Sequence, residues 1–222
     1  HVLFRRQRQM CIRDRIKEVE NESFAYIGNH SHSHDYLTKF NFEKFVEDIE
    51  RSINIFNNKL GYNPSFFSYP FGEYNLEQKN YISKNFEFAF GQHSGVIDLN
   101  KDKYELPRFP INEKYGELKR FKEVISYLPL QYKNIKPENK FMNADENPPK
   151  MIVEFFKDQK NLNNINCFSN EGSKWRKTNI VIDNNLLKVN FAEKFIERRG
   201  RINCSLKDES GWRFSGFQFV QN

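Results

Sequence analysis

The sequence predicts an α/β part with parallel strands, followed by a small antiparallel β-sandwich-like domain. Two observations predict this division. Helical and strand patterns alternate as far as residue 130, which favours parallel pairing of the strands. From residue 150 to residue 222 only strand patterns occur, separated by turn sequences. Between these parts, residues 131–149 are rich in Lys, Asn and Glu and hold three prolines, a composition typical of a linker.

A long amphipathic helix is expected first in the α/β part. Asn41 can cap it, seven apolar residues recur with helical spacing as far as Leu60, and Gly61 can end it. Alternating apolar patterns and Pro or Gly breaks then predict the remaining elements. These are a buried strand at 66–69, a helix near 76–84, strands at 86–90 and 108–111, and a helix near 116–127.

The last part of the chain shows six strand patterns. They lie at 151–156, 165–168, 178–182, 186–191, 202–206 and 212–220. Cys167 and Cys204 fall on two of these strands. In an exported protein they would form a disulfide that stabilises the small domain, and otherwise they would be two small buried residues.

Composition narrows the function classes. The net charge is +6, but the lysines are scattered and acidic residues lie between them, so no basic stripe with exposed aromatics indicates nucleic-acid binding. No run of apolar residues is long enough to predict a transmembrane helix. The basic segment 1–15 has the alternative interpretation of a tail for nucleic acid or anionic lipid.

The segment His30-Ser31-His32-Ser33-His34 is the most informative feature for function. His30 and His34 are four residues apart, so on a helical turn both imidazoles would project from one face and bind one divalent ion. Because a catalytic zinc normally takes three protein ligands, a third, usually a carboxylate, must come from elsewhere. The alternative is a solvated polar loop. His32 would face away from the pair, towards solvent.

Three segments carry a resemblance to a known family. They are Ile-Gly-Asn-His-Ser-His-Ser-His-Asp-Tyr-Leu at 27–37, Phe-Ser-Tyr-Pro-Phe-Gly-Glu-Tyr at 67–74 and Leu-Pro-Arg-Phe at 106–109. In this order they resemble motifs of the NodB-homology polysaccharide deacetylases, the family-four carbohydrate esterases. The third segment resembles the branch that acts on poly-N-acetylglucosamine-like chains. The resemblance covers residues 16 to 125.

The resemblance implies a fold and an activity. The fold would be an incomplete, distorted (β/α) barrel over residues 16–130. The activity would be metal-dependent hydrolysis of the N-acetyl groups of an amino-sugar polysaccharide, outside the cytoplasm. Two histidines, here His30 and His34, and one aspartate hold the metal, with zinc the expected ion. A second aspartate acts as base and a histidine as general acid.

The second motif implies a substrate groove. Tyr69, Pro70, Phe71, Gly72 and Tyr74 are the residues expected to contribute to it. The backbone N–H of Phe71 could stabilise the oxyanion, and Tyr74 could stack on a sugar ring. The alternatives are that the rings of Tyr69 and Phe71 belong to the core and that Tyr74 is an ordinary loop aromatic.

Two further residues are candidates for catalytic roles. His93, in the loop after the strand at 86–90, could replace the general acid that the family usually supplies from a later segment; otherwise it is a polar loop residue. Arg108 could orient the aspartate base, because Ser68 stands where the groove motif usually has arginine. A surface or structural ion pair is the alternative for Arg108.

The chain departs from the family pattern at its start. The Asp-Asp motif of the family normally precedes the histidine motif by some fifty residues, whereas only 29 residues precede His30 and their one aspartate is Asp14. Residues 1–15 resemble translated adapter sequence, so we expect them to be non-native and exclude them from the fold. The chain as written would then be inactive or nearly so.

Three functional hypotheses remain. The first is a metal-dependent polysaccharide N-deacetylase. The second is a catalytically lapsed relative that binds glycan without cleaving it. The third is a metal-storing or structural module, which would be favoured if His30 and His34 point apart.

Overall fold

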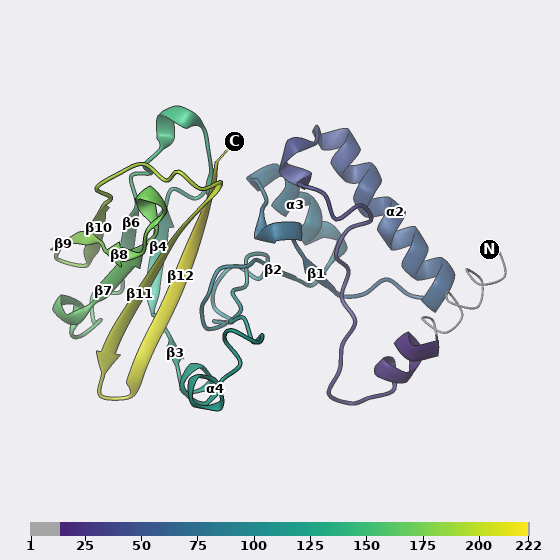
Figure 1. Ribbon diagram of the computed structural model, residues 1–222, viewed down its shortest axis with the longest axis horizontal. Helices are drawn as coiled ribbons and strands as arrows, with labels where there is room; N and C mark the ends of the chain where they lie inside the picture. Colours follow the sequence, from purple (N-terminus) through teal and green to yellow (C-terminus); the bar gives the residue numbers. More distant parts are fainter. Residues whose placement is uncertain (1–13, 222) are drawn as a thin grey trace.

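The computed structural model describes residues 14–221, which form an α/β half and a β half side by side (Figure 1). The α/β half begins with a helical segment at 14–20. Asp14 and Arg15, the last two residues of the excluded segment, belong to this helical segment, and residues 1–13 lie outside the described residues. Within the described part, no helix combines the length and the apolar character needed to cross a membrane.

The long helix α2 (Phe42–Leu60) is confirmed with both of its expected ends. The Asn41 side chain accepts a hydrogen bond from the backbone N–H of Lys44, and Gly61 takes the left-handed conformation that ends the helix. Its buried face joins the short 3₁₀ turn η1 (Leu37–Lys39) and α3 (Leu76–Asn85) around one core. The buried apolar residues of this core are Leu37, Phe45, Ile49, Phe67, Tyr69, Ile82, Phe86 and Ala89.

The strands of the α/β half run parallel, as predicted. β1 (Phe66–Ser68) pairs in parallel with β2 (Phe88–Phe90). Single parallel bridges extend the array on both sides, from Asn29 to β1 and from β2 to Leu106. Four neighbouring segments therefore point their carboxyl ends towards one edge, and a more complete barrel stays a prediction.

One expected element of this half differs from the structure, and another forms within its predicted range. The strand predicted at 108–111 does not form; the parallel bridge lies earlier, at Leu106, because Pro107 and Pro110 lack the N–H that a longer ladder requires. The helix α4 (Leu118–Ile125) forms but buries none of its residues.

The β half consists of two sheets that enclose one core. The four-stranded sheet has the order β4 (Tyr132–Lys136), β6 (Ile152–Phe155), β10 (Leu186–Asn190), β9 (Asn179–Asp183). The second sheet has the order β3 (Leu128–Pro129), β12 (Gly211–Gln221), β11 (Arg199–Asp208), β7 (Asn166–Ser169), β8 (Arg176–Lys177), with β5 (Phe141–Met142) also paired to β12. Buried residues of both sheets form the shared core, among them Val153, Leu187, Ile202 and Phe219.

The segment 131–149, predicted as a linker, is instead part of this half. Its residues form β4 and β5, which pair with β6 and β12. Its polar composition reflects an edge strand, since only one side of β4 pairs and none of its residues is fully buried. The pairs of β12 with β3 and β5 are parallel, so the second sheet is not purely antiparallel.

Cys167 on β7 and Cys204 on β11 are register partners and form a disulfide. Both residues are buried in the core of the β half. Of the two alternatives open from the sequence, the bridge is the one that the structure shows.

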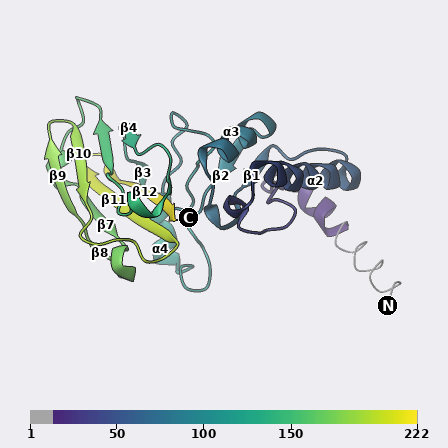
Figure 2. The same ribbon diagram turned by 90° about the horizontal axis from the view of Figure 1, so that it is seen from above.

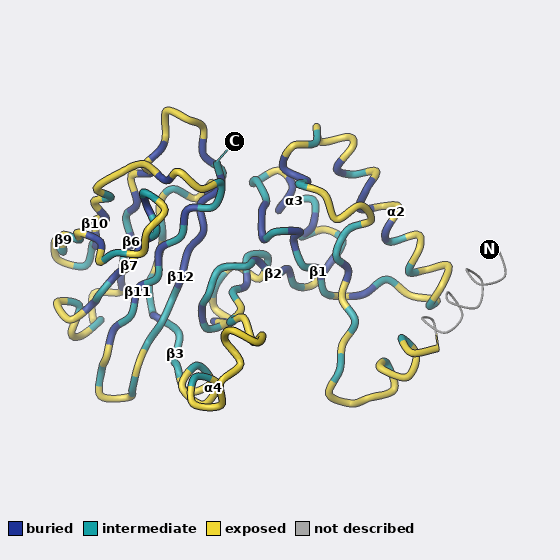
Figure 3. Tube along the Cα trace, in the orientation of Figure 1, coloured by how far each residue is buried: buried dark blue, intermediate teal, exposed yellow. Residues whose placement is uncertain are grey.

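Strand β12 carries much of the contact between the halves. The loop after β2 reaches this strand through an antiparallel bridge between Gly95 and Ser215. Figure 2, seen from above, likewise places the end of β12 beside the α/β half. In Figure 3 the strand is dark along its last part, where residues 216–220 are buried.

Candidate metal and substrate site

The histidine segment is a loop fixed at its start and in its middle, not the helical turn expected from the spacing. At its start, Asn29 receives and donates backbone hydrogen bonds with β1. In its middle, the carboxylate of Asp48 on α2 accepts the backbone N–H groups of His32 and Ser33, at 2.9 and 3.0 Å. Ser31 and His34 have positive φ angles, so the segment cannot continue as a right-handed helix.

The rings of His30 and His34 nevertheless converge. Their centroids are 4.7 Å apart in an edge-to-face arrangement. The Nδ1 atom of His30 lies 2.6 Å from the carbonyl oxygen of Ser68. Donation to that oxygen places the proton on Nδ1 and leaves the Nε2 lone pair for a metal, the usual way in which a protein orients a histidine ligand.

The electrostatic surroundings keep the His30 ring neutral. Burial lowers the pKa of His30, and the nearby charges of His34 and Arg108 lower it further against the opposing hydrogen bond to Ser68. A neutral imidazole is the form that binds metal. Residues 14–221 contain no group of three His, Cys, Asp or Glu side chains arranged to hold an ion, and a metal-binding role of the pair stays a prediction.

Phe71 lies next to this pair. Its ring stacks on Tyr36 at 4.1 Å and meets His34 edge-on at 5.0 Å. Phe71 has a φ of 58°, a left-handed conformation that a non-glycine residue keeps only when its surroundings hold it. Gly72, which follows it, is required because a Cβ atom there would lie 2.4 Å from the backbone nitrogen of Gln92.

Strand β12 of the other half fixes this turn. The side-chain amide of Gln218 donates to the carbonyl oxygens of Phe71 and Gly72, at 3.5 and 3.0 Å. Its Oε1 atom in turn accepts from Nε of Arg201 at 3.2 Å. The β half thus holds the turn that follows β1 beside the histidine pair.

Replacing Gln218 by Leu is expected to cost about 1–3 kcal/mol of unfolding free energy, because the two carbonyl groups lose their buried donor. Denaturant unfolding measures this loss. The Gln218→Glu variant is the stricter comparison, since it keeps the size of the side chain but replaces the donor by a third acceptor. Stability equal to wild type in both variants would contradict the anchoring role.

The two tyrosines of the groove motif lie in a different place from the one expected. Tyr69 is 1% exposed, and its hydroxyl donates to the carbonyl oxygen of Tyr104 at 3.1 Å. The Tyr74 ring packs on Tyr69 at 4.4 Å, and its hydroxyl donates to Glu105 at 3.0 Å. Burial, together with Glu105, raises the pKa of both phenols well above the ordinary value.

The burial of Tyr69 favours the alternative in which its ring belongs to the core, whereas Tyr74 is only partly buried and its contact with substrate stays a prediction. Tyr69 follows Phe67 by two residues, so both rings enter the same side of the strand and pack together in the core. Pro70 is buried as well. Among the five groove residues, Phe71 is the one whose ring the structure places against the histidine pair.

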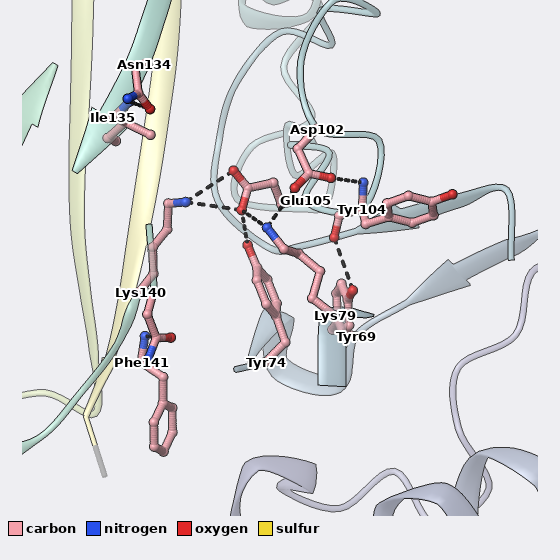
Figure 4. Close-up of polar contacts among 11 residues, drawn as sticks. Tyr69, Tyr74, Lys79, Asp102, Tyr104, Glu105, Asn134, Ile135, Lys140 and Phe141 are labelled. Atoms are coloured by element: carbon pink, nitrogen blue, oxygen red, sulfur yellow. Dashed lines mark hydrogen bonds and ion pairs between the residues drawn. The ribbon is translucent and has the colours of Figure 1, made fainter. Parts of the chain in front are cut away.

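A cluster of buried charges lies between the halves (Figure 4). Glu105 is its centre, with the ammonium groups of Lys79 at 3.4 Å and Lys140 at 3.1 Å. Lys79 also contacts Asp102 at 2.6 Å. Burial alone would raise the pKa of Glu105, but the two lysines outweigh it and lower that pKa to about 2. No sequence pattern indicates this cluster, because its members are scattered over three separate segments.

His93 belongs to this cluster's cavity rather than to the metal pair. The cavity is lined by His93, Glu105, Lys140 and Gln218, among others. Burial lowers the pKa of His93 to about 4, and Lys140 and Arg201 contribute against the opposing charge of Glu105. At pH 7 such an imidazole is neutral and lacks the imidazolium proton that a histidine general acid donates, which argues against this role for His93.

Arg108 lies near enough to His30 for its charge to act on that residue. Its charge contributes to the lowered pKa of His30, and its backbone N–H donates to the carbonyl oxygen of His93 at 3.0 Å. Within residues 14–221 it forms no ion pair with an acidic residue. Its role towards a base stays a prediction.

Residues 5–89 match the family described as polysaccharide deacetylase. The match includes the loop with His30 and His34 and the turn with Phe71, and it begins inside the segment 1–15. A peptidoglycan-N-acetylglucosamine deacetylase of Bacillus cereus is 38% identical over 58 residues, which cover 26% of this chain and 21% of that protein. The chain therefore spans about a fifth of this relative's length.

A solved structure also resembles the chain in part. It is the Streptococcus pyogenes deacetylase PplD in complex with acetate. The TM-score is 0.41 at 16% sequence identity, over 44% of this chain and 43% of that one.

Proposed function

We propose that this chain forms part of a metal-dependent hydrolase that removes N-acetyl groups from an amino-sugar polysaccharide. The observation that carries the proposal is the convergence of the His30 and His34 rings, with the Ser68 carbonyl leaving Nε2 of His30 available. The family that residues 5–89 match supports the reaction class.

The roles of the residues follow from their chemistry. His30 and His34 would hold the divalent ion, and zinc suits two imidazole ligands. When bound, such an ion polarises an amide carbonyl and lowers the pKa of a water molecule. Phe71 supplies the turn whose backbone N–H would donate to the oxyanion, and Arg108 supplies positive charge beside His30. The disulfide suits an oxidising compartment, so we place the activity outside the cytoplasm.

Zinc titration of the chain tests the site. Wild type is expected to bind one equivalent, and His30→Ala and His34→Ala should each weaken binding at least about tenfold, since second-shell changes alone cost about 10–100-fold. His32→Ala is the matched control, because His32 lies in the same loop and is exposed. Unchanged affinity in both ligand variants would remove the metal site and the proposed function with it.

A second candidate function is glycan binding without cleavage. It is favoured by the finding that residues 14–221 bring no acidic third ligand to the histidine pair. Acetate release from N-acetylated amino-sugar oligomers in the presence of zinc separates the two functions. Release that is lost in His34→Ala supports the hydrolase, whereas saturable binding of the same oligomers without release supports the binding protein.

A further inference from the structure

The edge strands of the β half are not equally protected. An edge strand presents unpaired N–H and C=O groups to which another strand can add, and proteins commonly block such edges with very short strands, lysine, proline or a register shift. Strands β3, β5 and β8 are each two residues long, and β3 ends on Pro129. Strand β4 has a register shift after Tyr132 and carries Lys133 and Lys136.

Strand β9 has none of these protective features. Its sequence, Asn-Ile-Val-Ile-Asp, contains no lysine, proline or glycine, and all five residues pair with β10 without interruption. Within the described part of the chain, β9 has no neighbouring strand on its other side. Figures 1 and 2 both place it at the end of the β half that is remote from the α/β half. A further strand could therefore reach this edge.

The hairpin determines which backbone groups of β9 point outwards. A two-residue loop joins β9 to β10, so Asp183 and Leu186 form a hydrogen-bonded pair. Hydrogen-bonded pairs alternate along an antiparallel ladder, which leaves the N–H and C=O groups of Ile180 and Ile182 pointing away from β10. Among residues 14–221, no backbone hydrogen bond outside the ladder involves these four groups.

The sequence of β9 is complementary to itself when two copies run antiparallel about Val181. Ile180 of one copy then lies opposite Ile182 of the other, and the outward groups of both residues form four hydrogen bonds between the copies. Asn179 lies opposite Asp183, which places an amide donor against a carboxylate acceptor. Val181 lies opposite Val181 of the second copy.

Pairing would also cover apolar side chains on both faces of β9. Ile180 and Ile182 are partly buried at the margin of the core that the two sheets share, and pairing would extend this core from one copy into the other. Val181 lies on the outer face and is 49% exposed. Its burial against the same side chain of the second copy favours association. A two-fold axis through Val181 gives a closed pair, not an open chain of copies.

We propose that two copies of the protein pair through β9 and form a dimer. The four-stranded sheets of the two copies then join into one continuous sheet, with β9 beside β9 at its centre. The dimer does not depend on the proposed function. Because β9 lies far from the α/β half, the histidine pairs of both copies stay outside the interface (Figure 1).

Light scattering of Val181→Glu tests the interface. Two like charges would face each other across the two-fold axis, whereas within one copy the new carboxylate lies beside Lys188, its cross-strand neighbour. Ile196→Glu is the matched control, because Ile196 is another exposed apolar residue, 70% exposed, and lies outside β9. Wild type and Ile196→Glu should have the mass of two chains, and Val181→Glu should have half that mass.

Two cysteine variants, each combined with Cys11→Ser, test the register independently. In Val181→Cys the two new thiols lie directly opposite each other, with Cβ atoms about 4.5–5.5 Å apart, so they can form a disulfide between copies. In Asn179→Cys they lie four residues apart along the strands, about 13 Å, which a disulfide cannot span. Electrophoresis without reductant should show a linked dimer for Val181→Cys only.

Each of three results would overturn the dimer. They are a wild type that has the mass of one chain, a dimer that persists in Val181→Glu, and equal linking in the two cysteine variants. Zinc titration does not require the dimer, so failure of this proposal and failure of the proposed function are distinguishable.

Discussion

Replacing Glu105 by Ala is expected to destabilise the protein by about 3–5 kcal/mol, as for other buried ion pairs that lose one partner. The side chains of Lys79 and Lys140 are 10% and 9% exposed, so both ammonium groups would lose a carboxylate that water cannot fully replace. The Tyr74 hydroxyl would lose its acceptor as well. Denaturant unfolding at pH 7 measures the change.

Glu154→Ala is the matched control for this variant. Glu154 also pairs with a lysine, Lys133, at 3.0 Å, but that pair lies on the surface. Its removal should cost less than about 1 kcal/mol. Similar losses in Glu105→Ala and Glu154→Ala would show that the buried cluster contributes no more than an ordinary surface pair.

The same cluster predicts how stability depends on pH. The pKa of Glu105 is lowered to about 2, so its stabilising effect is complete above pH 4.5 and is lost as the pH falls towards 2. The pKa of His93 is lowered from 6.5 to about 4. Below pH 6.5 His93 therefore binds a proton in the unfolded chain, whereas in the folded chain it stays neutral until the pH approaches 4. The free energy of unfolding consequently declines between pH 6.5 and 4. His93→Gln should reduce this upper decline, to which the lowered pKa of His30 also contributes, and keep the lower one.

Reduction of the Cys167–Cys204 bridge is expected to lower the free energy of unfolding by about 4 kcal/mol. The loss comes from the chain entropy of the loop that the bridge closes, whose two cysteines are 37 residues apart in the sequence. The double variant Cys167→Ala/Cys204→Ala, unfolded by denaturant beside the oxidised protein, gives the value directly. Both proteins should carry Cys11→Ser, so that the third cysteine cannot exchange. Equal unfolding midpoints for the bridged and bridge-free proteins would contradict the expectation.

Local signals explain why so much of the fold is predictable. Helix α2 carries its cap, its apolar face and its glycine stop within the segment itself, and both of its ends agree with the sequence. The six strands expected after residue 150 all form, because each has an apolar pattern bounded by turn residues. The edge strand β4 was not predicted because three of its five residues are exposed.

Features that depend on distant contacts could not be predicted in the same way. The spacing of His30 and His34 suggests a helical turn, yet Asp48 on α2 fixes the segment as a loop, and the rings meet for that reason. Tyr69 matches a groove motif, yet its ring packs against the ring of Phe67 in the core. The family resemblance indicated the candidate site residues. Only the packing of the two halves shows which of these residues are available to bind a metal or a substrate.

The bond from Gln218 to the turn at Phe71 has a consequence for biosynthesis. The two residues are 147 positions apart, so the turn leaves the ribosome long before its anchor is made. Until strand β12 emerges, Phe71 has no partner for its carbonyl oxygen from that strand and no reason to keep its left-handed backbone. The turn beside the histidine pair therefore gains this anchor only after translation of the β half, and a nascent chain halted before residue 218 should carry the motif without it.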